Sequence, residues 1–223
     1  MSQELGTLSE HLDLGESSVI DEGVLIGYPS ERITQSERLV IGKNARIRSG
    51  SVIYCGSKIG DNLQTGHSVL IREENLIGNN FSIWNNSVVD YGCVIGNNIK
   101  IHCGVYIAQY TVIEDDVFIA PGVVVANDTH PGCRYSDRCM KGPTIKKGAQ
   151  IGVNATLLPF ITVGEQSLIG GGSVVTKDVP PKSVVHGNPA RVVKKIDDLR
   201  CVTGLTDKPY GSHPIRGVRS SRI

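Results

Sequence analysis

Residues 59–98 read IGDNLQTGHSVLIREENLIGNNFSIWNNSVVDYGCVIGNN, and this stretch decides the fold. An Ile-Gly pair recurs in it every eighteen residues, at Ile59-Gly60, Ile77-Gly78 and Ile95-Gly96. Self-similarity at a fixed period is the sequence signature of a repeat architecture, in which each short unit stacks on the next. The stretch therefore predicts a solenoid with an eighteen-residue coil.

A shorter period of six runs through this stretch and beyond it. Counting by six from Ile41 to Val125 gives fifteen positions, and all except Thr65 are Ile or Val. The series also occurs outside that span, at Ile20, Ile26, Ile145, Ile151, Leu157, Val163, Ile169 and Val175. Small or β-branched residues recur four places after many of these positions, at Ala45, Ser51, Ser57, Cys93, Val117, Val123, Ala149, Ala155, Ser167 and Ser173.

The six-residue period predicts one short strand and one turn per hexad. The aliphatic residue and its small companion point inward, and Gly or Asn relieves the turn, where φ is often positive. Three hexads close a triangular coil, and successive coils stack as parallel strands whose buried aliphatic side chains each contribute roughly 1.5–3 kcal/mol. An amphipathic helix would instead need apolar residues at i, i+3, i+4 and i+7. We therefore predict an all-β protein built as a three-sided prism.

Residues 18–195 resemble the hexapeptide-repeat acyltransferases, and most closely the bacterial sugar and nucleotide-linked amino sugar acetyltransferases. The similarity is greatest over residues 142–196, GPTIKKGAQIGVNATLLPFITVGEQSLIGGGSVVTKDVPPKSVVHGNPARVVKKI. The resemblance implies a left-handed parallel β-helix, acetyl-CoA as acyl donor, and a homotrimer with active sites between adjacent prisms. The left hand comes from this resemblance, because it opposes the usual right-handed crossover.

Breaks in the repeat suggest the domain organisation. We expect an N-terminal segment at 1–17 and a β-helix over 18–180, interrupted by loops at 28–39 and 126–143. The coil should end at Pro180-Pro181, followed within 181–223 by a short helix around 190–200 and an irregular arm from Cys201 onward.

Composition excludes several classes of protein. The formal net charge of the 223-residue chain is +1, whereas a nucleic-acid-binding surface needs a strong basic excess. No apolar run approaches the ~18 residues of a membrane span, and the N-terminus lacks the pattern of a secretory signal. Six cysteines without a C-x-x-C pair then indicate free thiols in a reducing cytoplasm, and we expect no metal.

His130, within Thr129-His130-Pro131 of the second loop, is the first catalytic candidate. An unperturbed imidazole titrates near pH 6.5 and can therefore accept a proton at neutral pH. A solvated loop histidine is the alternative interpretation. In the sugar O-acetyltransferases that the chain resembles, a His-Pro in the equivalent loop supplies the catalytic base, and the resemblance assigns that role to His130.

His67 and His102 lie off the inward register and should face outward. Outward histidines are usually only solvated, but the resemblance places active sites on outer faces, so both are candidates for catalytic or substrate contact. A zinc carbonic anhydrase is a minor alternative, because catalytic zinc needs three protein ligands and the natural third position is the core residue Ile107.

Three further residues are candidates for substrate binding. Asn85 lies outward beside Trp84, the only tryptophan, and an Asn in this region touches the sugar in related nucleotide-sugar N-acetyltransferases. Glu73 and Glu74 beside Arg72 are consistent with a solvated corner. If functional, one of these carboxylates would hold a substrate amine or orient a histidine.

The C-terminal motif GNPARVVKKI provides the cofactor candidates. By resemblance, basic residues near the chain end meet the phosphates of coenzyme A, which assigns Arg191 and Lys194, with Lys177 behind them. Arginine offers a planar fork to phosphate and lysine a compact charge. Gly170 opens a three-glycine run that would let a thioester approach backbone amides closely, or that serves only as a turn.

The function predicted from the sequence is acetyl-CoA-dependent N-acetylation of a nucleotide-linked amino sugar in surface polysaccharide or glycan biosynthesis. The alternative is sugar O-acetylation with His130 as general base, because a hydroxyl needs a base more than a neutral amine does. A non-enzymatic structural β-helix and transfer from an acyl-carrier protein are minor alternatives. The sequence does not determine which sugar, nucleotide or position is acylated.

Overall fold

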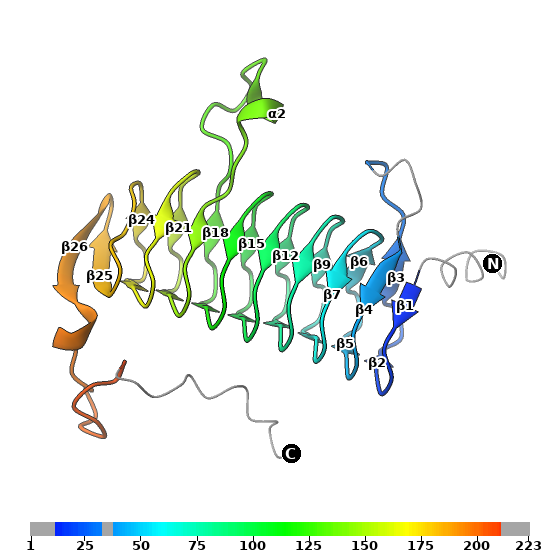
Figure 1. Ribbon diagram of the computed structural model, residues 1–223, viewed down its shortest axis with the longest axis horizontal. Helices are drawn as coiled ribbons and strands as arrows, with labels where there is room; N and C mark the ends of the chain where they lie inside the picture. The colour runs from blue at the N-terminus through cyan, green and yellow to red at the C-terminus, as the bar shows by residue number, and fades with distance from the viewer. Residues whose placement is uncertain (1–11, 33–37, 211–223) are drawn as a thin grey trace.

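The computed structural model describes residues 12–32 and 38–210, which form a long three-sided prism with the coils stacked along its axis (Figure 1). Strands three apart in the chain pair in parallel, so each flat side of the prism is one sheet. We call the three sides sheets A, B and C in the order in which the chain visits them.

The strands are short, mostly of two residues. Sheet A contains β1 (Leu12–Leu14), β4 (Leu39–Ile41), β7 (Lys58–Ile59), β10 (Leu76–Ile77), β13 (Val94–Ile95), β16 (Val112–Ile113), β19 (Thr144–Ile145) and β22 (Thr162–Val163). Sheet B contains β2 (Val19–Ile20), β5 (Arg46–Ile47), β8 (Gln64–Thr65), β11 (Ser82–Ile83), β14 (Lys100–Ile101), β17 (Phe118–Ile119), β20 (Gln150–Ile151), β23 (Leu168–Ile169), β25 (Ser183–Gly187) and β26 (Ala190–Lys195). Sheet C contains β3 (Leu25–Tyr28), β6 (Val52–Tyr54), β9 (Leu70–Ile71), β12 (Val88–Val89), β15 (Tyr106–Ile107), β18 (Val124–Val125), β21 (Thr156–Leu157) and β24 (Val174–Val175).

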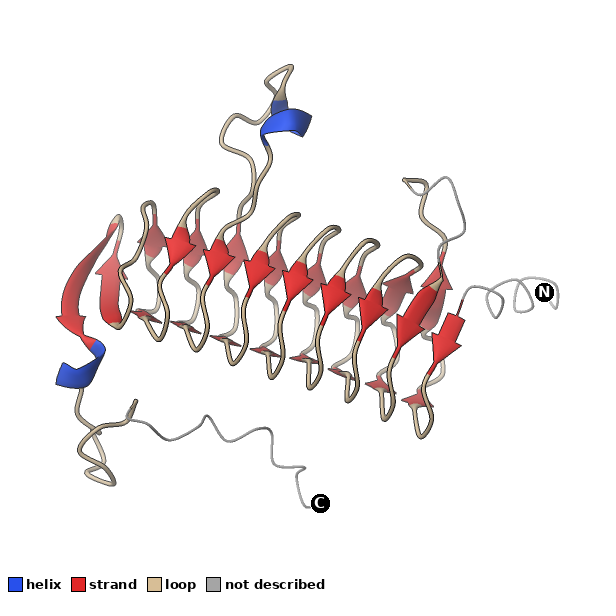
Figure 2. Ribbon diagram, in the orientation of Figure 1, coloured by secondary structure: helices blue, strands red, loops and turns tan. Residues whose placement is uncertain are grey.

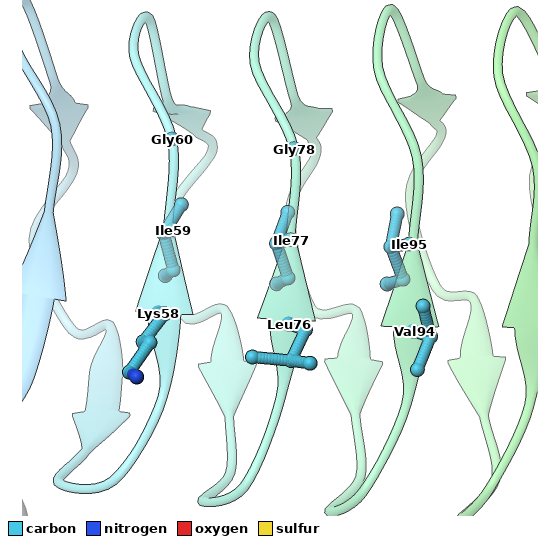
Figure 3. Close-up of a pocket in the computed structure, with 8 residues that line it drawn as sticks. All are labelled: Lys58, Ile59, Gly60, Leu76, Ile77, Gly78, Val94 and Ile95. Carbon is cyan, nitrogen blue, oxygen red and sulfur yellow. The ribbon is translucent and has the colours of Figure 1, made fainter.

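The eighteen-residue period is the register of the sheets. Ile59 pairs with Ile77, and Ile77 with Ile95, on adjacent coils of sheet A. Figure 3 shows these three side chains side by side on successive coils, with Lys58, Leu76 and Val94 on the other face of their strands. The isoleucines are buried, and Leu76 and Val94 are about half exposed. Thr65, the exception in the series, is also buried, and its hydroxyl accepts the backbone N–H of Arg48 at 2.9 Å.

The corner between sheets A and B is a ladder of side-chain amides. Each amide donates to the next coil, from Asn44 to Asn62, Asn80, Asn98 and finally Asp116, at 2.8–3.1 Å. All five residues have a φ between 58° and 63°, the left-handed region that asparagine tolerates better than most residues. The turn asparagines of the sequence therefore relieve the backbone and also link the coils.

Both ends of the prism differ from the sequence prediction. Within the described residues the solenoid already includes Leu12, because β1 pairs with β4, so it does not begin at residue 18. It does not end at Pro180-Pro181, because β25 follows these prolines and pairs in parallel with β23.

The helix expected around 190–200 is also wrong. Residues 190–195 form β26, antiparallel to β25, and only the 3₁₀ turn η1 (Ile196–Asp198) is helical. The free edge of β25 and the β-branched pair Val192-Val193 favour a strand there.

Two segments leave the coil, and both leave at the corner between sheets C and A. The first follows β3 and the second follows β18, which ends at Val125, with the short helix α2 (Ser136–Cys139) inside the second segment (Figure 2). Residues 33–37 of the first segment, residues 1–11 and the last part of the expected arm, 211–223, lie outside the described residues. Within residues 12–32 and 38–210 no helix has the length and apolarity to cross a bilayer.

Candidate active site

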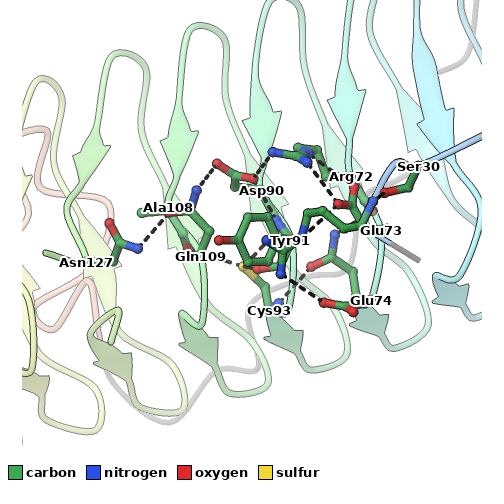
Figure 4. A network of polar contacts seen from close by, with 12 residues as sticks. Ser30, Arg72, Glu73, Glu74, Asp90, Tyr91, Cys93, Ala108, Gln109 and Asn127 are labelled. Carbon is green, nitrogen blue, oxygen red and sulfur yellow. Dashed lines mark hydrogen bonds and ion pairs between the residues drawn. The ribbon is translucent and has the colours of Figure 1, made fainter. Parts of the chain in front are cut away.

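A polar network occupies the corner between sheets C and A, between the two ejected segments (Figure 4). Most of its members directly follow strands β9, β12, β15 and β18, so the register stacks them on adjacent coils. We call this set the corner network, which consists of Arg32, Arg72, Glu73, Asp90, Tyr91, Tyr106, Gln109 and Asn127.

Glu73 lies at one end of the corner network, where it contacts Arg72 and Arg32. Its side chain is fully buried, and its carboxylate accepts from Arg72 at 2.8 and 3.1 Å and lies 3.3 Å from Arg32 Nε. A buried carboxylate needs such partners, because its desolvation cost is otherwise uncompensated. The solvated corner expected for Glu73 is therefore wrong, whereas its neighbour Glu74 is exposed and lies 3.8 Å from Arg32.

Arg32 connects the first ejected segment to this corner. Its guanidinium carbon lies 3.6 Å from the centre of the Tyr91 ring, in addition to its contacts with the glutamates. A cation over an aromatic face is attracted by the ring quadrupole. The start of the first segment is therefore fastened to the body of the prism.

Asp90 is the centre of the corner network. One oxygen accepts from Arg72 at 3.2 Å and from the backbone N–H of Tyr91 at 2.9 Å. The other accepts from the Tyr106 hydroxyl at 2.8 Å and from Gln109 Nε2 at 2.5 Å. Burial, together with donation to Asp90, raises the pKa of Tyr106 to about 12, so this phenol stays protonated as a donor.

Gln109 and Asn127 extend the network to the root of the second segment. Gln109 Oε1 accepts from Asn127 Nδ2 at 2.7 Å. The backbone carbonyl of Asn127 accepts the N–H of Lys141 at 2.8 Å, which closes the two ends of the segment onto each other. The segment that carries His130 is thus tied at its base to Asp90.

His130 lies on this segment, which stands well away from the prism (Figure 1). Its backbone N–H donates to Asp128 at 2.8 Å, and Ser136 donates to the other oxygen of Asp128. These two donors, Ser136 first, lower the pKa of Asp128. The His130 ring is exposed and its Nδ1 lies 3.1 Å from the Thr129 hydroxyl. With Nδ1 engaged in this way, Nε2 is the ring nitrogen left to act as an acceptor.

His67 and His102 occupy a different corner, between sheets B and C. His67 is exposed, its Nδ1 lies 2.9 Å from the Ser49 hydroxyl, and its backbone N–H donates to the Asn85 side chain at 3.0 Å. His102 is half-buried against the edge of Phe118, with ring centres 5.1 Å apart. Burial, and then the charge of Lys100, lowers the pKa of His102.

The structure therefore brings His67 and Asn85 together on adjacent coils, with Trp84 half-buried in the same turn as Asn85. It does not place either of them, or His102, beside His130 within one chain, because His130 extends from another corner.

The cofactor candidates lie toward the C-terminal end of the prism. Arg191 and Lys194 are exposed on β26, and Lys177 is exposed in the turn after β24. Close packing explains why residue 170 is glycine, because an added Cβ would lie 2.8 Å from the Cβ of His186. The close approach at Gly170 is thus to strand β25 of the same chain.

Asp90, Tyr106, Gln109 and Asn127 were not predicted from the sequence. The signal that could have found them is the eighteen-residue period itself, applied to polar positions. Arg72 and Asp90 share one row along the corner, and Tyr91, Gln109 and Asn127 share the next. Among residues 12–32 and 38–210 no three His, Cys, Asp or Glu side chains group as a metal site would require.

No family model matches the chain. Over 95 residues it is 41% identical to the galactoside O-acetyltransferase of Escherichia coli (strain K12), a match that covers 40% of this chain and 47% of that protein. Over 90 residues it is 38% identical to a Schizosaccharomyces pombe (strain 972 / ATCC 24843) protein provisionally named an acetyltransferase, covering 39% of this chain and 44% of that protein. The matches thus span less than half the length of these curated relatives.

Among solved structures, a Bacillus cereus protein provisionally described as an acetyltransferase superposes with a TM-score of 0.52 at 24% identity, over 78% of this chain and 84% of that chain. This superposition confirms the fold, a left-handed parallel β-helix. Together with the named relatives, it confirms the resemblance of the chain to the hexapeptide-repeat acyltransferases. Among these relatives, the galactoside O-acetyltransferase has an acceptor in its name.

Proposed function

We propose that the protein is an acetyl-CoA-dependent acetyltransferase that acetylates a hydroxyl group of a sugar. The observation that carries this proposal is the exposed ring of His130, whose Nδ1 lies 3.1 Å from the Thr129 hydroxyl on a segment anchored to the prism. The galactoside O-acetyltransferase among the relatives supports a hydroxyl acceptor. N-acetylation of a nucleotide-linked amino sugar is the second candidate, because the sequence of residues 142–196 resembles that of nucleotide-sugar N-acetyltransferases.

In the proposed reaction, His130 Nε2 accepts the proton of the acceptor hydroxyl as its oxygen attacks the thioester carbonyl. A backbone N–H at the cleft hydrogen-bonds the developing oxyanion. The carbon–sulfur bond then breaks, the acetyl group stays on the sugar oxygen, and the imidazolium returns its proton to the departing thiolate. This direct transfer requires no covalent intermediate on the protein.

We further propose that the active unit is a homotrimer. The segment bearing His130 projects beyond its own prism, so the opposite wall of a cleft must come from another copy. The outer faces of sheets A and C are suited to such contact, because Leu76, Val94, Leu25 and Val124 are 44–52% exposed apolar side chains. Arg191, Lys194 and Lys177 would bind the phosphates of coenzyme A, and His67, His102, Asn85 and Trp84 stay candidates for the facing wall. The cytoplasmic location expected from the sequence also stays a prediction.

The test is thiol release from acetyl-CoA by the purified full chain, with galactosides, other free sugars and nucleotide-linked amino sugars as acceptors. Replacing His130 by alanine should lower turnover by roughly 10²–10⁴-fold, the usual contribution of a general base. Asp137→Ala is the matched control, because Asp137 is an exposed residue of the same segment and has no role in the proposed reaction.

Product chemistry separates the two acceptor classes. Mild alkali hydrolyses an O-acetyl ester and leaves an N-acetyl amide intact. An alkali-resistant product made only from amino sugars would replace the first candidate by the second. Failure of every acceptor to stimulate thiol release, or full turnover by His130→Ala, would refute the proposed function.

A further inference from the structure

The root of the segment 126–143 is held by a hydrogen-bond chain that the proposed reaction does not itself use. Asn127 contributes two bonds there, since its carbonyl accepts from Lys141 and its amide donates to Gln109. His130 follows Asn127 by only three residues, and Asp128 between them fixes the His130 backbone. The bonds made by Asn127 therefore help to determine where the His130 ring lies relative to the prism.

The other end of this chain is rigid. Gln109 donates to Asp90, a residue that is only 6% exposed. The Asp90 carboxylate also accepts from Arg72, from the Tyr106 hydroxyl and from the Tyr91 backbone N–H. A carboxylate with four donors has little freedom to reorient. Its oxygen is thus a fixed point to which Gln109 and then Asn127 are attached.

Nothing in the repeat itself requires these two side chains. The coils are held by the backbone ladders and by the inward aliphatic residues, and the equivalent positions on earlier coils are Cys55, Glu73 and Tyr91. Gln109 donates to Asp90 and accepts from Asn127. Among the described residues, this pair of side-chain bonds is found where the chain leaves the coil to form the segment that carries His130.

We propose that Gln109 and Asn127 are positioning residues for acetyl transfer: through Asp90 they fix the root of the segment 126–143, so that His130 is presented at one distance from the acceptor. This inference rests on the proposed function, because it takes His130 as the base. Misplacement of a reacting group by about 1 Å can cost on the order of 10²-fold in rate, so a single hydrogen bond at the root has a large kinetic consequence.

The first experiment compares Asn127→Ala with Asn97→Ala in the full chain. Asn97 is the matched control, because it also donates a side-chain hydrogen bond across coils, to Asp115 at 3.1 Å, but at the corner between sheets A and B. Asn127→Ala should lower kcat by roughly 10–100-fold with the KM for acetyl-CoA unchanged, while Asn97→Ala keeps kcat within about twofold. Melting temperatures should fall by similar amounts in the two variants.

The second experiment uses charge. In Gln109→Glu the added carboxyl lies beside Asp90, near Arg72, Tyr106 and the buried Cys93. When protonated it can donate to Asp90 as the amide does, and when ionised it repels Asp90. The ratio of kcat in this variant to kcat in the wild type should therefore fall as pH rises. The double variant Asp90→Asn with Gln109→Glu exchanges donor and acceptor and should recover most of the lost kcat at high pH.

The outcomes distinguish this inference from the proposed function. If His130→Ala turns over as fast as the wild type, the proposed function fails. If His130→Ala is inactive but Asn127→Ala and Gln109→Glu match the wild type at every pH, only the positioning role fails. A loss of kcat that merely follows the melting temperature, equally in Asn127→Ala and Asn97→Ala, would likewise overturn it as a structural effect.

Discussion

Replacing Asn80 in the corner ladder by alanine should destabilise the prism more than replacing it by glycine. Asn80 has a φ of 59° and makes two side-chain hydrogen bonds, accepting from Asn62 and donating to Asn98, each at 2.8 Å. Both substitutions remove these bonds, at about 0.5–1.5 kcal/mol each. They differ only in how the new residue tolerates the left-handed backbone.

The difference between the two variants can be estimated from the backbone alone. An alanine in the left-handed region costs about 1–2 kcal/mol. Glycine is free of that strain but loses about 0.5–1 kcal/mol more conformational entropy on folding. The glycine variant should therefore be more stable by about 0.5–1 kcal/mol, which corresponds to about 1–4 °C in Tm for a domain of this size.

Asn79, the preceding residue, provides the matched control. It has no positive φ, and its side chain also links coils, accepting from the Asp61 backbone at 2.8 Å. At Asn79 the order should reverse, with alanine more stable than glycine. Thermal and urea unfolding followed by circular dichroism measure all four variants, and equal urea m-values show that the same amount of structure unfolds in each. The same order at both positions, or alanine above glycine at Asn80, would refute the reasoning.

Two further predictions concern one ion pair and one close contact. The hydrogen bond from Lys146 is the main cause that lowers the pKa of Glu114. The extra stability of the wild type relative to Glu114→Gln should therefore be fully present above pH 4.5 and disappear as the pH falls through the lowered pKa. Extra stability that persists at pH 2 in urea titrations would contradict this. Gly170→Ala should cost about 1–3 kcal/mol, because the new methyl group meets the Cβ of His186 at 2.8 Å. Gly171→Ala should cost less, because its nearest neighbours, a side-chain methyl and the carbonyl oxygen of Val153, lie at 3.1 and 3.3 Å; equal urea midpoints for the two variants would contradict the assignment.

The fold could be predicted from the sequence because inward positions repeat with one period over most of the chain. Even Thr65, the irregular member, satisfies the rule, since its methyl and hydroxyl fit an inward position where a backbone N–H is available. Prediction failed at the last strand. A run such as Ala190–Lys195 has no period of six, and what makes it a strand is the free edge of β25, which only the folded solenoid provides.

The candidate site was predictable only in part. His130 became a candidate because its segment visibly breaks the repeat and because the family resemblance assigns a base to its His-Pro pair. Glu73 was mistaken for a solvated residue because Arg32, which covers it, comes from a segment whose path no spacing rule predicts. Asp90 and Gln109 were overlooked because each looks like an ordinary turn residue until the register places it beside its partners.

The corner between sheets C and A can hold the candidate site because insertions there leave the ladders intact. Most paired residues are eighteen apart, but pairs that span the first segment are 27 apart, as Leu12 with Leu39, and pairs that span the second are 32 apart, as Val112 with Thr144. The extra residues of both segments are therefore absorbed entirely at this corner, while the inward positions on either side keep their stacking. A strand interior could not accept such an insertion, because a shift of one residue would turn every inward side chain outward. The same corner leaves side chains such as Arg72 and Asp90 outside the aliphatic core, where they can pair with one another. The position of His130 thus follows from where a hexad repeat can lengthen without losing register, and the corner network follows from what must then hold the added segment in place.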